Sequence, residues 1–111
     1  MGADAARVAR TESFFRHVNE RIAESAEGFG GDEAEFVCEC ADPTCTHRVE
    51  LTLVEYERVR EESTTFLLQP GHEDERVERV IRRGRGYAVV DKFHRKVAQI
   101  VRQLDPRQKP V

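Results

Sequence analysis

FVCECADPTCTHRVELT (residues 36–52) places three cysteines and one histidine within ten consecutive positions. The alternation of apolar and polar residues predicts two short strands, 36–40 and 45–52, joined by a tight loop at Asp42-Pro43. Residues two apart on a strand project to the same face, so Cys38 and Cys40 would face the same way. Cys45 and His47 would lie opposite them across the hairpin. The stretch therefore predicts a β-hairpin with several metal-binding side chains on one face.

Thiolates and imidazoles are the ligands that zinc prefers, and three Cys with one His is a common structural set. Cys38, Cys40 and Cys45 supply the three thiolates. The fourth ligand has two candidates. His47 is near in sequence but lies in the plane of the hairpin, whereas His72 follows the turn Pro70-Gly71 and could approach from outside that plane.

Two observations favour reduced thiols over disulfides. The N-terminal residues MGADAARVAR lack the apolar core of a signal peptide, which predicts a cytoplasmic protein. Three cysteines is also an odd number, so a disulfide framework would leave one unpaired. No apolar run approaches the ~20 residues that a bilayer span requires, and no contact with a membrane is expected.

The remaining patterns predict a single α+β domain over residues 1–111, with flexible ends at 1–10 and 106–111. On the N-terminal helix the apolar positions are Phe14, Phe15, Val18, Ile22 and Ala26. The predicted elements outside the cysteine hairpin are a helix at 11–27, a short helix at 52–62 that opens with a Thr52/Glu55 capping box, a strand at 64–69, a hairpin at 76–92 turning at 84–86, and a closing helix at 93–104. The first arm of the second hairpin, 76–83, also fits a helical period.

Charge is distributed unevenly along the chain. The net charge is −3, but residues 20–62 hold thirteen acidic and four basic residues, and residues 76–111 hold eleven basic and three acidic ones. Within the basic segment 76–96, Arg82, Arg83 and Arg85 could hold phosphates while the Tyr87 ring stacks on a base.

Enzymatic motifs are missing from the sequence. It contains no H-E-x-x-H, no zinc-deaminase signature, no G-x-S-x-G and no phosphate-binding loop. Glu39 lies between two cysteines, but a strand would direct it to the opposite face. Four candidate ligands would also fill the zinc coordination sphere, so we do not expect an enzyme.

Four segments occur in the order FVCECADPTC, LTLVEYERVR, FLLQPGHE and YAVVDK. This order resembles a family of small uncharacterised bacterial proteins over residues 14–107. The resemblance implies that Cys38, Cys40, Cys45 and His72 form the metal set, with His47 outside it. It implies no activity or substrate.

The function expected from the sequence is that of a small zinc-binding adaptor or regulatory protein, which acts by binding an unidentified protein partner. One alternative is a nucleic-acid-binding regulator that uses the basic segment 76–96. Another is a redox or metal sensor that uses the zinc thiolates.

Overall fold

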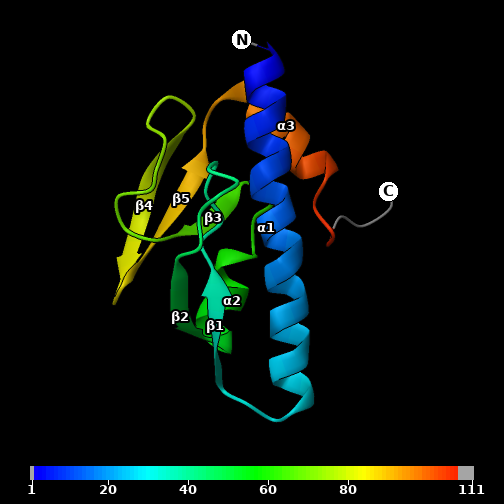
Figure 1. Ribbon diagram of the computed structural model, residues 1–111, viewed down its shortest axis with the longest axis vertical. Helices are drawn as coiled ribbons and strands as arrows, with labels where there is room; N and C mark the ends of the chain where they lie inside the picture. The colour runs from blue at the N-terminus through cyan, green and yellow to red at the C-terminus, as the bar shows by residue number, and fades with distance from the viewer. Residues whose placement is uncertain (1, 108–111) are drawn as a thin grey trace.

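A computed structural model describes residues 2–107 and has the α+β architecture expected from the sequence (Figure 1). The described residues form three helices and five strands. Their bounds, in chain order, are α1 Gly2–Gly28, β1 Glu33–Val37, β2 Arg48–Thr52, α2 Leu53–Val59, β3 Thr65–Leu68, β4 Glu78–Gly84, β5 Tyr87–Lys92 and α3 Arg95–Gln103. The predicted order of helices and strands is therefore confirmed.

The strands form two small antiparallel sheets. In the first, β1 pairs with β2, with Phe36 opposite Val49. In the second, β5 lies between β3 and β4. The segment 76–83, which also fitted a helical period, lies largely in strand β4, because β5 provides a pairing partner along its length. Helix α1 runs nearly the length of the molecule, with the sheets on one side and α3 beside its N-terminal half (Figure 1).

Helix α2 begins where the sequence placed its capping box. The Glu55 backbone N–H donates to the Thr52 hydroxyl at 3.0 Å, and the Thr52 backbone N–H donates to the Glu55 carboxylate at 2.8 Å. The Tyr56 and Val59 side chains of α2 are buried, and the Tyr56 ring stacks on Phe36 with centroids 4.4 Å apart. The short helix thus closes the apolar space beneath the β1–β2 hairpin.

Helix α1 differs from the expectation in its start and in its buried face. Residues 2–10 were expected to be flexible, but they form the first turns of α1, and Ala5 and Ala9 are buried there. The Phe14 side chain, which belonged to the predicted apolar face, is 64% exposed. No helix within residues 2–107 has the length and apolar character to cross a bilayer.

The inward face of α1 is largely polar. The side chains of Glu12, Arg16 and Asn19 have no exposed surface, although charged side chains are seldom buried without partners. The Arg16 guanidinium donates to the backbone carbonyls of Ser63 and Thr65, which lie at the start of β3. These hydrogen bonds fix the helix against the second sheet.

Glu12, Glu78 and Lys92 form a second polar group in the interior, which we call the buried ion cluster. The Lys92 ammonium donates to Glu12 at 2.7 Å and also to Glu78. It lies 4.6 Å from the centre of the Phe66 ring, and the Arg16 guanidinium lies 3.5 Å from the same centre. The cluster therefore joins α1, β4 and β5 through charges that water does not reach.

The C-terminal residues that the structure describes are held against the protein. The Arg107 guanidinium donates to the carboxylates of Glu20 on α1 and Glu57 on α2. The predicted flexible tail began at Pro106; its last four residues, 108–111, lie outside the described residues.

Candidate metal centre

The first sheet ends before it reaches the cysteines. The strands were expected to include Cys38, Cys40, Cys45 and His47, but β1 ends at Val37 and β2 begins at Arg48. The last backbone contact across this hairpin is from the Cys38 N–H to the His47 carbonyl, at 3.1 Å. The cysteines are therefore carried by the irregular connection between the strands.

Glu39 explains why the ladder stops. Its backbone N–H donates to the Leu67 carbonyl at 2.8 Å, and its carboxylate accepts the Leu67 N–H at 3.0 Å. After Val37 the chain therefore stops pairing with β2, and Glu39 forms its hydrogen bonds with Leu67 of β3. The Glu39 carboxylate also accepts from the Asn19 amide at 2.8 Å. The sequence-based prediction that Glu39 points away from the metal site agrees with these contacts.

A turn after β3 positions the imidazole. The His72 N–H donates to the Gln69 carbonyl at 3.0 Å, which closes a four-residue turn with Pro70 and Gly71 in the middle. Gly71 has φ of +90°, as the third residue of a type II turn requires. The Pro-Gly-His motif therefore acts through local geometry and directs His72 back toward the cysteines.

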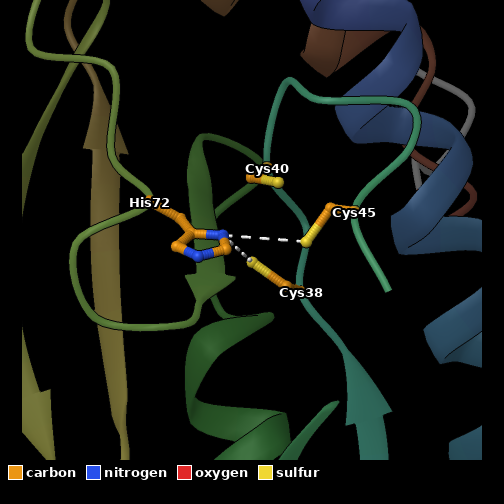
Figure 2. A group of neighbouring side chains, drawn as sticks. All are labelled: Cys38, Cys40, Cys45 and His72. Carbon is orange, nitrogen blue, oxygen red and sulfur yellow. Dashed lines mark hydrogen bonds between the residues drawn. The ribbon is translucent and has the colours of Figure 1, made fainter. Parts of the chain in front are cut away.

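The donor atoms of Cys38, Cys40, Cys45 and His72 all lie within 4.8 Å of one another (Figure 2). The His72 Nδ1 atom lies 3.7 Å from the Sγ atoms of both Cys38 and Cys45. In a tetrahedral site with ordinary zinc bond lengths, sulfur and nitrogen lie about 3.6 Å apart and two sulfurs about 3.8 Å apart. The four residues, which we call the metal cluster, could therefore hold one metal ion after a small contraction.

Each sulfur of the metal cluster accepts a hydrogen bond from the backbone. The Gln69 N–H donates to the Cys38 sulfur at 3.2 Å. The Asp42 and His47 backbone amides donate to Cys40 and Cys45, and each lowers the pKa of the thiol that it contacts. Such donors favour the thiolate, which is the form that binds metal.

The three thiols also influence one another. The hydrogen bond between Cys38 and Cys40 lowers the pKa of Cys40 to about 5 and raises the pKa of Cys38 above its usual range. Burial raises the pKa of Cys45. One thiolate is thus stabilised by its neighbours, and a bound cation would stabilise all three.

The two histidine candidates lie side by side, but only His72 belongs to the group. The ring centres of His47 and His72 are 4.7 Å apart, with the rings nearly perpendicular. The His47 side chain is exposed and packs against the edge of its neighbour. The turn at Pro70-Gly71 brings His72, and not His47, into the group of ligands. His72 follows β3 and approaches the cysteines from another segment, as the sequence suggested.

Burial differs within the metal cluster. Cys38 and Cys40 are buried, with 1% and 2% of their surface exposed, whereas Cys45 and His72 are partly exposed. The first pair is inside the apolar core, and the second pair closes the site toward solvent. An ion bound here would join the segment 38–45, between β1 and β2, to the loop between β3 and β4.

Sequence reasoning missed Asn19, which holds the cysteine connection to α1. Its amide donates to the Val37 carbonyl and accepts the Val37 N–H, both at 2.8 Å, and it also contacts Glu39. Glu12, Arg16 and Asn19 recur at helical spacing, which places them on one face of α1. A polar face of this kind usually contacts solvent, so the sequence alone did not indicate that Asn19 is buried.

The residues proposed to contact nucleic acid differ in burial. The Tyr87 side chain is 7% exposed, and its hydroxyl donates to Glu55 at 3.2 Å. Its ring packs so closely over Gly84 that a Cβ atom there would lie 2.1 Å from the ring. Tyr87 therefore cannot stack on a base in this structure, whereas Arg83 and Arg85 are exposed near the tip of the β4–β5 hairpin and Arg82 is partly buried.

Searches of protein-family models, of curated proteins and of solved structures found no match to this chain. The resemblance to small bacterial proteins therefore remains an interpretation of the motifs.

Proposed function

We propose that Cys38, Cys40, Cys45 and His72 bind one zinc ion, and that this ion has a structural role. The observation that carries the proposal is the convergence of three sulfurs and one imidazole nitrogen within 4.8 Å, from two separate segments of the chain. Three thiolates and one imidazole suit zinc better than magnesium or calcium, which prefer oxygen ligands.

A structural role follows from the number and origin of the ligands. Four protein donors complete a tetrahedral sphere and leave no position for water or substrate. The ion would link the connection after β1 to the loop after β3. A chain of 111 residues has a modest core, so such a link would contribute substantially to its stability.

We propose that the metal-stabilised domain acts as an adaptor or regulator that binds another protein, and is not an enzyme. The separation of charge supports a binding role, because acidic and basic surfaces can select different partners. Nucleic-acid binding through segment 76–96 is the second candidate, supported by the exposed Arg83 and Arg85 side chains. The buried Tyr87 ring disfavours base stacking.

Elemental analysis and unfolding of the purified protein test the proposed metal site. We expect about one zinc per chain, with the chain unfolding when a strong chelator removes the metal and refolding when zinc is returned. A chain that contains no zinc and has the same unfolding midpoint with and without chelator would contradict the proposal.

A further inference from the structure

An acidic groove lies between the C-terminal half of α1 and α2. It consists of two adjoining open hollows that share Glu27 and Glu57 as lining residues. The residues that define the groove in the following argument are Glu20, Glu24, Glu27, Val54, Glu57 and Glu61.

One end of the groove already holds a cation from the chain itself. The Arg107 guanidinium donates to both carboxylate oxygens of Glu57, at 2.8 and 2.7 Å, and to Glu20 at 3.1 Å. The planar guanidinium also lies 6.0 Å from the centre of the Tyr56 ring. This end of the groove therefore has the geometry that binds an arginine side chain.

The rest of the groove is also acidic, with more carboxylates than basic side chains among its lining residues. Glu24, Glu27 and Glu61 are exposed, and none of them forms an ion pair within residues 2–107. Arg58 is the one basic side chain that lines this part of the described surface. The carboxylates thus retain a negative potential beyond the position of Arg107.

The same surface offers an apolar contact. The Val54 side chain is 80% exposed on α2, and Leu53 beside it is partly buried at the wall of the first hollow. An exposed valine alone is unremarkable on a protein surface. Val54 lines the same hollow as the unpaired carboxylates of Glu27 and Glu61. A surface that combines acidic and apolar side chains in this way matches a segment with both basic and apolar residues.

We propose that the acidic groove is the docking surface for a basic segment of a partner protein, whose cationic side chains contact Glu24, Glu27 and Glu61 while an apolar side chain covers Val54. The inference rests on the protein-binding role proposed above and names its surface. Arg107 is the internal example of the contact that the partner repeats. Charge complementarity would raise the association rate, and the apolar contact would lengthen the lifetime of the complex.

Fluorescence anisotropy with three labelled peptides tests the proposal on the full chain. The peptides are GRLRVKRG, its polar counterpart GRSRSKRG and its acidic counterpart GELEVEEG. At ~0.15 M salt we expect the first peptide to bind with a dissociation constant of ~10–100 μM, the second at least about fivefold more weakly, and the third not at all.

Two charge variants locate the binding. Glu24→Gln/Glu27→Gln/Glu61→Gln removes the groove carboxylates, and Glu33→Gln/Glu35→Gln/Glu50→Gln removes three exposed carboxylates from the β1–β2 hairpin. The groove variant should weaken binding of the first peptide at least about tenfold and the hairpin variant less than about twofold. Val54→Ser should weaken it about threefold or more.

Equal weakening by the two triple variants would contradict the proposal, because the peptide would then respond to net charge alone. So would the absence of binding to the full chain. Binding that emerges only after residues 108–111 are removed would identify the chain's own tail as the occupant. A dimer in light scattering that the groove variant dissociates would identify a second copy.

Zinc content and unfolding midpoint, measured for every variant, separate this inference from the metal proposal. A groove variant that retains its zinc but loses the peptide supports both proposals. If the purified chain contains no zinc and still binds the peptide, the result would contradict the metal proposal and support the docking groove.

Discussion

The metal cluster and the buried ion cluster solve the same physical problem in opposite ways. Both bring polar side chains from distant segments into a largely buried space, where a group that water does not reach requires a partner. In the buried ion cluster the partners are part of the chain: Lys92 lies between Glu12 and Glu78. In the metal cluster all four side chains are potential metal ligands, and the partner that we propose for them is an ion from solution.

This difference determines how each region responds to change. The stability supplied by the metal cluster should follow the availability of the ion, because binding energy is then folding energy. The buried ion cluster should respond most to the loss of Lys92, because both Glu12 and Glu78 rely on that one cation. One oxygen of Glu12 already has no hydrogen-bond partner within the described residues.

The largest effect is expected from Cys40→Ser, which removes a buried ligand and replaces a thiolate with a hydroxyl that binds zinc poorly. We expect loss of stoichiometric zinc and a fall of about 5 kcal/mol or more in the free energy of unfolding, which is comparable with the whole stability of a small domain. Circular dichroism and elemental analysis measure both. Thr46→Ser, an exposed neighbour, is the matched control; a Cys40→Ser protein that behaves like this control would contradict the account.

Lys92→Met tests the buried ion cluster, and should cost about 3–5 kcal/mol by leaving the buried Glu78 carboxylate without its cation and Glu12 without its hydrogen-bond donor. Urea unfolding gives the value, with Lys96→Met on the exposed face of α3 as the control. Unlike the cysteine variant, this protein should still contain one zinc. A cost no greater than that of the control would mean that the cluster contributes nothing net.

A third prediction concerns pH. Burial raises the pKa of Glu12 from 4.5 to about 8, against the opposing effect of Lys92 on β5 and with a further increase from Glu78 on β4. At pH values between 4.5 and about 8, Glu12 keeps a proton in the folded chain that it has lost in the unfolded chain. The Glu12 contribution to stability is therefore complete below about pH 4.5 and falls as the pH rises to about 8.

Urea unfolding at several pH values, with Glu12→Gln as the reference, isolates this contribution. We expect the stability of the wild-type chain relative to the variant to decrease by up to ~1 kcal/mol per pH unit between pH 6 and 8, and to level off above that. A relative stability that is constant or increases over this interval would contradict the assignment.

The smallest effect is expected from His47→Ala. The His47 ring packs on His72 from outside and is exposed, so its loss should leave zinc bound and change stability by less than about 1 kcal/mol. His72→Ala should instead release zinc readily. Competition with a chromophoric chelator compares the two; if His47→Ala retains zinc less well than His72→Ala, the ligand assignment is wrong.

The contrast also explains what the sequence could predict. The metal cluster uses rare residue types close together, and the turn at Pro70-Gly71 has a local signature, so the sequence indicated His72 as a candidate. The Thr52/Glu55 capping box is equally local and was predicted correctly. Features of this kind depend on a few neighbouring residues and need no knowledge of the tertiary structure.

The buried ion cluster could not be predicted in the same way. Glu12 and Lys92 are common residues separated by eighty positions, and each resembles a solvated surface residue until the helix and the sheet are in place. The ends of β1 and β2 were misplaced for a related reason. Glu39 pairs with Leu67 on β3, and this long-range contact overrides the local preference of the hairpin.

X-ray absorption at the zinc edge of the purified protein tests the central claim most directly. The account predicts three sulfur neighbours at ~2.3 Å and one nitrogen neighbour at ~2.0 Å, supplied by Cys38, Cys40, Cys45 and His72. His72→Ala should replace the histidine nitrogen with a water oxygen, and so remove the scattering of the outer imidazole atoms, or remove the zinc. His47→Ala should leave the spectrum unchanged. A wild-type spectrum dominated by oxygen and nitrogen neighbours, or the absence of a zinc signal, would contradict it.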